Sequence, residues 1–120
     1  MKTSKMIGPA LDWSVAKCEG VPLVFKGRKW PTDGAGKFCG PFVASLCWDS
    51  YSPSTNWQMG GPLIEREGIR LHRSVTGQWW ADLESDPHRP VAGPTPLIAA
   101  MRCYVASRLG DTVDVPEELL

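Results

Sequence analysis

The chain has 120 residues, 42% of them hydrophobic, which is enough for one buried core, and we predict a single domain spanning residues 1–120. Lysine plus arginine and aspartate plus glutamate both number 13, so the formal net charge is zero. A neutral chain lacks the positive field that holds a polyanion, and binding to duplex nucleic acid is not expected.

Signals for a membrane segment, a disulfide framework or a metal site are missing from the sequence. No apolar stretch reaches the roughly 20 residues of a membrane span, and the N-terminus lacks the apolar segment of a signal peptide. We therefore expect no membrane partner and a cytoplasmic location. His72 and His88 lack the spacing of a zinc site, and no cofactor is expected. Without a C-x-x-C spacing, the cysteines are predicted to be thiols: Cys18, Cys39, Cys47 and Cys103.

Residues 3–20 have the spacing of a first helix. Apolar side chains recur at intervals of four, four and three residues, and Gly20 supplies a stop. The pair Gly8-Pro9 leaves the start open, because Pro9 at the first helical position would separate the first turn from the main helix. The predicted apolar face consists of Ile7, Leu11, Val15 and Cys18.

Strands are predicted next. Val21 to Lys26 and Phe42 to Trp48 read as short strands on either side of a glycine-rich, cationic stretch. Leu63 to Arg73 fits a strand or a bulged pair of strands. Ser74 to Gln78 then forms the turn of a hairpin, with Trp79 to Leu83 as the second strand.

The segment Asp86 to Pro94 is predicted to be a proline-rich connection to a second helix. Thr95 supplies the N-cap of that helix, Pro96 its first position and Gly110 its stop. The tail, residues 111–120, alternates valines with acids and could add an edge strand or dock on a second subunit. Because each helix has a single apolar stripe, we predict an α+β fold, a small antiparallel sheet with two helices packed on one face.

The run from Tyr51 to Ile69, YSPSTNWQMGGPLIEREGI, is the strongest candidate for a binding loop. Its hydroxyl and amide side chains form turns and offer hydrogen bonds, and its glycines let backbone N–H groups approach a ligand. The polar side chains are those of Ser52, Ser54, Thr55 and Asn56, and the glycines are Gly60 and Gly61.

The same run, with ALDWSVAKCEG at residues 10–20 and GPTPLIAAMRCYVASRLGDTVDVPEEL at residues 93–119, resembles the NinX-like family of small tailed-phage proteins. These three blocks cover about half of the chain. The resemblance implies a phage accessory protein in the host bacterial cytoplasm. It supplies no catalytic residue.

Aromatic and cationic side chains complete the predicted site. Trp57 lies in the polar run, and Trp80 faces away from Trp79 on its strand, so both are candidates for stacking on a nucleobase, with packing as the alternative. Thr95 opens the second helix, where N–H groups and the helix dipole attract anions, and Arg102 follows about two turns later. Simple capping by Thr95 is the alternative.

Charged residues at Glu65, Arg66, Glu67 and Arg70 could be read as an acid or base beside an oxyanion-stabilising arginine. Alternating charges on a strand are more often a solvated face, and no nucleophile with a base accompanies them. We therefore expect no enzymatic activity.

Two functions remain. In the first, the chain binds and sequesters a small nucleotide-type ligand, such as a host immune second messenger of the cyclic dinucleotide or ADP-ribose class. In the second, it is a protein-interaction module that docks on a host enzyme or replication factor. The polar run at residues 51–56 favours the nucleotide binder. A homo-oligomer is also predicted, because the chain has more aromatic residues than a small core needs and a hydrophobic end at Leu119 and Leu120. The predicted ligand-binding residues are Tyr51, Ser52, Ser54, Thr55, Asn56, Trp57, Gly60, Gly61, Trp80, Thr95 and Arg102.

Overall fold

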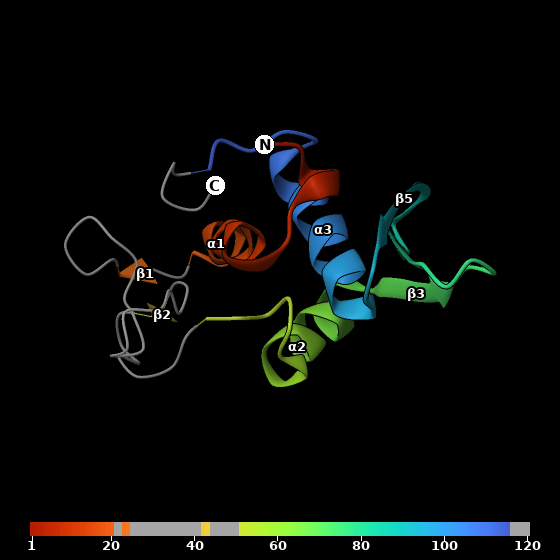
Figure 1. Cartoon of the computed structure of the whole chain (residues 1–120), viewed down its shortest axis with the longest axis horizontal. Helices are drawn as coiled ribbons and strands as arrows, with labels where there is room; N and C mark the ends of the chain where they lie inside the picture. Colours follow the sequence, from red (N-terminus) through yellow and green to blue (C-terminus); the bar gives the residue numbers. More distant parts are fainter. Residues whose placement is uncertain (21–22, 25–41, 44–50, 116–120) are drawn as a thin grey trace.

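The chain folds around one long helix, α3, which contacts a three-stranded sheet and two further helices (Figure 1). The computed structural model describes residues 1–20, 23–24, 42–43 and 51–115. The predicted α+β class is confirmed. In chain order the elements are the 3-10 turn η1 (Thr3–Lys5), α1 (Gly8–Glu19), β1 (Leu23–Val24), β2 (Phe42–Val43), α2 (Trp57–Glu67), β3 (Ile69–Arg73), β4 (Trp79–Leu83), β5 (Asp86–Gly93) and α3 (Pro96–Leu109).

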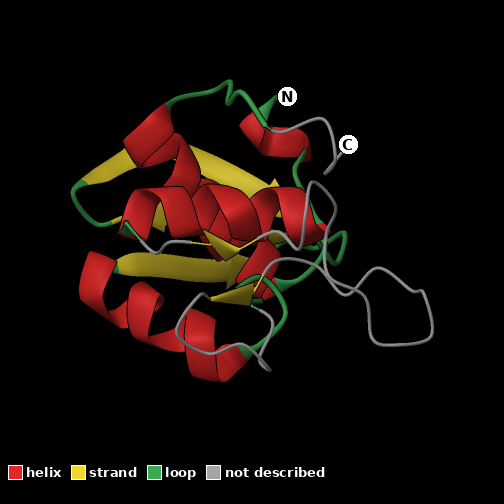
Figure 2. Cartoon of the chain, turned by 90° about the vertical axis from the view of Figure 1, so that its left-hand side faces the viewer, coloured by secondary structure: helices red, strands yellow, loops and turns green. Residues whose placement is uncertain are grey.

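Helix α3 is buried on most of its surface rather than along a single stripe. Ala99, Met101 and Val105 are fully buried, and Tyr104 is 1% exposed. The helix packs on all three strands of the sheet, α1 packs on α3, and α2 packs on α3 and β3. Figure 2 looks from the helix side, so the helices lie in front of this sheet. The sequence predicts two helices in one layer. In the structure α3 is central, and α1 and α2 pack against it.

The three-stranded sheet is antiparallel in the order β3-β4-β5. The predicted hairpin is confirmed: Leu71 pairs with Ala81, and Gly77 adopts a positive φ in the turn. Trp79 lies on the face packed against the core, so its neighbour Trp80 faces away from α3.

The prediction of a connection at Asp86 to Pro94 was wrong, because residues 86–93 form the third strand. Pro87 and Pro90 argue against a strand in sequence, yet they are tolerated here because β5 is an edge strand that pairs with β4 alone. Gly93 allows the end of β5 to approach α3 closely. A Cβ on Gly93 would lie 2.6 Å from Ala99 N.

The first helix is split as the Gly8-Pro9 pair suggested, with Pro9 in the first turn of α1 and Gly20 ending it in the left-handed conformation. The next predicted strands pair antiparallel, Leu23 with Val43. The rest of both strands, and the stretch between them, lie outside the described residues. Within the described ranges, none of the helices is both long and apolar enough to cross a membrane.

The loop predicted from Tyr51 up to the strand at Leu63 was wrong from Trp57 onward. Residues 57–67 form α2, which includes the Gly60-Gly61-Pro62 sequence. The strand predicted from Leu63 therefore begins only at Ile69. Glycine and proline are poor helix formers, which is why the sequence pattern indicated a turn.

The N-terminal segment and the tail lie together at the end of α3 (Figure 1). Lys2 and Thr112 form an isolated antiparallel bridge, and the Thr3 N–H donates to Asp111 O at 2.9 Å. Val113 and Val115 are buried. The tail was predicted to be an edge strand, and over residues 111–115 its strand pairing is limited to this bridge. Leu119 and Leu120 lie outside the described residues.

Candidate functional site

The loop before α2, residues 51–56, uses its polar groups within the protein. The N–H groups of Thr55 and Asn56 both donate to Ser52 O, at 3.1 and 2.9 Å. The Asn56 side chain caps α2 by accepting a hydrogen bond from Gln58 N–H at 2.9 Å. Tyr51 is half-buried against the core, and burial raises its pKa. The Asn56 side chain and these two N–H groups are therefore occupied by structural hydrogen bonds.

Ser54 ties this loop to α1. It is 1% exposed, and its N–H donates to Asp12 Oδ1 at 2.9 Å. Burial raises the pKa of the Asp12 carboxyl to about 6, although the hydrogen bond from Ser54 opposes the shift. The contact fixes the segment that leads into α2, and Ser54 is not accessible to a ligand.

The two glycines of the predicted loop have different environments in α2. A Cβ on Gly60 would lie 2.4 Å from Pro53 O and 2.6 Å from Leu97 Cδ2, so Gly60 is required for packing. Nothing lies within 4 Å of the position of a Cβ on Gly61. Trp57, four residues earlier on the same helix, is 54% exposed. Trp57 is thus exposed, whereas Gly61 is only partly exposed.

The start of α3 does lie against α2, through Leu97 and Gly60, but its predicted binding groups have structural roles. Thr95 Oγ1 accepts a hydrogen bond from Ile98 N–H at 3.1 Å and so caps the helix. Arg102 is 9% exposed, and its guanidinium donates to Met6 O at 2.7 Å and to Ala92 O at 3.0 Å. Arg102 therefore joins the N-terminal segment to β5.

Trp80 lies apart from the loop before α2. It is half-buried on the sheet face turned away from α3, beside His72 on β3 and Ala92 on β5. On the neighbouring strand, Arg70 Nε donates to Asp82 Oδ1 at 2.7 Å. The predicted residues are thus divided between two sides of the sheet and do not form one pocket.

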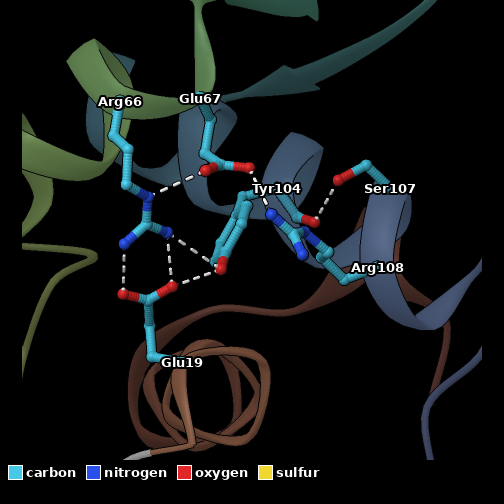
Figure 3. A network of polar contacts seen from close by, with 6 residues as sticks. All are labelled: Glu19, Arg66, Glu67, Tyr104, Ser107 and Arg108. Carbon is cyan, nitrogen blue, oxygen red and sulfur yellow. Dashed lines mark hydrogen bonds and ion pairs between the residues drawn. The ribbon is translucent and has the colours of Figure 1, made fainter.

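Of the four charged residues predicted on a strand, Arg70 is on β3, whereas Glu65, Arg66 and Glu67 lie in the last turn of α2. Arg66 and Glu67 belong to a network that joins the C-terminal parts of three helices (Figure 3). Arg66 contacts Glu19 of α1 and Glu67, each at 2.8 Å. Arg108 of α3 contacts Glu67 at 2.7 Å, and the Tyr104 hydroxyl donates to Glu19.

The electrostatics of this network indicate a structural role. The hydrogen bond from Arg66 lowers the pKa of Glu19, and that from Arg108 lowers the pKa of Glu67. Burial, with a smaller effect of Glu19, raises the pKa of Tyr104 to about 12. Both carboxylates are thus held ionised by arginines, and the four charges balance. Such a network holds helix ends together and offers no poised acid or base.

A second candidate binding site lies between β5, the C-terminal half of α3 and the N-terminal segment. We call it the β5–α3 groove. Its first part is a cavity of about 130 Å³ with apolar walls from Leu83, Val91, Cys103 and Ala106. Its second part, about 270 Å³, shares Val91, Ala106 and Asp111 with the first and extends to residues 2–4. The two parts therefore adjoin each other.

Four charged residues line this groove. Asp86 and Arg89 of β5 border the first part, Lys2 borders the second, and Asp111 borders both. Across residues 1–20 and 51–115, none of these four is in an ion pair. An apolar floor with a few converging polar groups is the usual form of a small-molecule site.

None of the groove residues was predicted from the sequence. Asp86, Arg89 and Val91 were assigned to a connection, and Lys2 lies far from Asp111 in the chain. The charged residues Asp86 and Arg89, beside Pro87 and Pro90, were the available signal. It would have required recognising that prolines are compatible with an edge strand.

Comparison with known proteins supplies the family. No curated protein matched the chain. The model of the family described as "Bacteriophage P22, NinX" matches residues 2–108, which include the groove residues up to Ser107, the helix network and the loop before α2. The match spans far more than half of the sequence, and the chain belongs to this bacteriophage NinX family.

Proposed function

We propose that this phage protein binds and sequesters a small nucleotide-type ligand in the β5–α3 groove. The observation that carries the proposal is the convergence of two cations and two carboxylates, none in an ion pair within the described residues, on an apolar floor. The site differs from the one expected in the loop before α2, because the Asn56 side chain and the N–H groups of Ser54, Thr55 and Asn56 bond within the protein, and Ser54 is buried.

A nucleotide has the groups that this lining would recognise. Arg89 and Lys2 suit phosphate oxygens, since a guanidinium or ammonium forms charge-assisted hydrogen bonds with them. Asp86 and Asp111 can accept hydrogen bonds from ribose hydroxyls. The apolar surface of Val91 and Ala106 can pack against a base. Sequestration requires tight binding and no bond making.

Size narrows the ligand class. Ligand pockets usually measure roughly 300–1,000 Å³, and each part of the groove is smaller than that. A nucleotide-sized ligand must therefore span both parts and contact both cations. For a phage protein, such a ligand would be a host immune second messenger, an ADP-ribose derivative or a cyclic dinucleotide.

Calorimetric titration of the full chain with ADP-ribose, cyclic ADP-ribose, AMP and cyclic dinucleotides tests the proposal. We expect at least one to bind and to be recovered unchanged. Arg89→Ala should weaken that ligand about tenfold or more, because a charge-assisted hydrogen bond contributes roughly 1.5–3 kcal/mol.

Arg73→Ala is the matched control, since Arg73 is also an exposed arginine on a strand but does not line the groove. It should leave the affinity within about twofold. If no nucleotide binds, or if both variants weaken binding equally, the groove is not the site. The function as a protein-interaction module would then replace the nucleotide proposal.

A further inference from the structure

The β5–α3 groove contains more negative charge than a phosphate site needs. Asp86 of β5 and Asp111, which follows α3, both border its first part, although they lie far apart in the chain. Arg89 borders the same part, and Lys2 borders the second. The lining therefore carries two positive and two negative charges, and their sum is zero.

A fully anionic ligand does not match this lining. The phosphate oxygens of a nucleotide are attracted by Arg89 and Lys2 but repelled by the carboxylates of Asp86 and Asp111. A hydrogen bond from a ribose hydroxyl does not remove this repulsion, because the hydroxyl is neutral and the carboxylate keeps its charge. Charge complementarity is better met by a ligand that has a positive group as well as its phosphates.

The walls of the first part indicate which kind of positive group fits. Asp86 is half-buried and shares this part with apolar side chains. An ammonium group is compact and strongly hydrated, whereas a positively charged aromatic ring spreads its charge and packs its faces on apolar atoms. A cavity of about 150 Å³ holds one benzene ring, and the first part measures about 130 Å³. Its size therefore suits a single six-membered ring. The apolar side chains are those of Leu83, Val91, Cys103 and Ala106.

We infer that the ligand of this groove is an ADP-ribose derivative with a positively charged ring, which lies in the first part beside Asp86 while the pyrophosphate contacts Arg89 and Lys2. The inference rests on the proposed function and narrows its ligand. The bases of cyclic dinucleotides are neutral, whereas a pyridinium ring joined to ADP-ribose, as in oxidised nicotinamide adenine dinucleotide (NAD⁺), has the required charge. Asp111 borders both parts and remains suited to a ribose hydroxyl.

Calorimetric titration of the full chain with NAD⁺ and with its reduced form, NADH, tests the inference. The two molecules differ by one hydride on the nicotinamide ring, which is positive in NAD⁺ and neutral in NADH. We expect NAD⁺ to bind at least about tenfold more tightly. Both titrations contain EDTA, so that no divalent cation bridges the carboxylates to the phosphates. ADP-ribose, which lacks the ring, is titrated alongside them.

Asp86→Asn removes the negative charge and keeps the shape of the side chain. It should reduce the preference for NAD⁺ to less than about threefold, mainly by weakening NAD⁺. A loss of structure would weaken both ligands equally, so the ratio of the two affinities reports on the charge. Glu84→Gln is the matched control, since Glu84 is an exposed acid in the turn before β5 and does not line the groove. It should leave the preference unchanged.

The outcomes separate this inference from the proposed function. If ADP-ribose or either form of the dinucleotide binds, but NAD⁺ binds no more tightly than NADH, the inference is overturned and the proposed function stands. A preference that survives Asp86→Asn, or that Glu84→Gln removes as fully, also overturns the inference. If neither form, nor ADP-ribose, nor a cyclic dinucleotide binds, the proposed function fails as well.

Discussion

Helices α3 and α2 begin alike and are held in different ways. Each has a side-chain cap, Thr95 on α3 and Asn56 on α2. After its first position, α3 contains only residues that a helix tolerates, whereas α2 contains Gly60, Gly61 and Pro62 in its middle. Relative to alanine, glycine costs about 1 kcal/mol and proline about 3 kcal/mol in a helix interior. The sequence of α2 alone therefore disfavours the helix that it forms.

The contacts of α2 with the rest of the protein offset this disadvantage. Leu63 is 6% exposed in the core, and Gly60 lets the helix approach Leu97 closely. At its last turn, Arg66 and Glu67 bond to α1 and α3. Helix α3 is therefore stabilised by its local sequence, whereas α2 depends on tertiary packing.

The largest expected effect comes from Gly60→Ala. Alanine is the better helix former, but its Cβ would overlap Pro53 O and Leu97 Cδ2, and we expect the free energy of unfolding to fall by about 3 kcal/mol. Gly61→Ala is the matched control, because its Cβ would meet nothing within 4 Å beyond its chain neighbours; the strain of a Cβ before Pro62 opposes the gain in helix propensity, so the change should stay within about 1 kcal/mol. Chemical denaturation measures both changes. Stabilisation by both substitutions would mean that α2 is governed by propensity after all.

A change of pH should have a smaller effect on the free energy of unfolding. It acts through Asp12, which accepts the hydrogen bond from Ser54 N–H in the segment before α2. The folded-state pKa of Asp12, about 6, lies above the ordinary value of 3.8, so protonation favours the folded state. This stability is fully present below pH about 3.8 and is lost as the pH rises through about 6. Acidification from pH about 7.5 to about 5 should therefore stabilise the protein by roughly 1–2 kcal/mol.

Asp12→Asn tests the assignment, because an amide oxygen can still accept the Ser54 hydrogen bond but does not titrate in this range. Denaturation curves of the variant should lose the gain between pH about 7.5 and about 5. Glu19 and Glu67 act at lower pH: their lowered pKa values mean that stability is lost only as the pH falls below about 4.5. An unchanged pH profile in Asp12→Asn would contradict the assignment.

The smallest effect, and the most direct comparison of the two helices, comes from their caps. Asn56→Ala and Thr95→Ala should each lower stability by about 1 kcal/mol, because each leaves a helix N–H without its partner. Hydrogen exchange should separate them. Asn56→Ala should speed exchange mainly in α2, whereas Thr95→Ala should act on the whole core, since α3 contacts every other main element. Equal, global acceleration in both variants would mean that α2 and α3 open as one unit.

Several side chains with hydrogen-bonding groups have partners within the protein. The sequence predicts Asn56 and Arg102 as ligand-binding residues, and in the structure their side chains bond to Gln58, Met6 and Ala92 within the protein. A polar side chain has the same chemistry whether it meets a ligand or a buried backbone group. Only the distances in the folded chain separate the two cases.

The sequence by itself determined α1, the β3–β4 hairpin and α3, because caps, stops and turn residues act over a few neighbouring positions. The NinX family could also be identified from short blocks of sequence, and the family model bears this out. Tertiary structure alone decided that residues 57–67 are a helix and residues 86–93 a strand. It also brought Lys2 and Asp111 to one groove. Packing energy between segments distant in the chain exceeds the local preferences of glycine and proline, and the order of residues does not reveal which distant segments will meet.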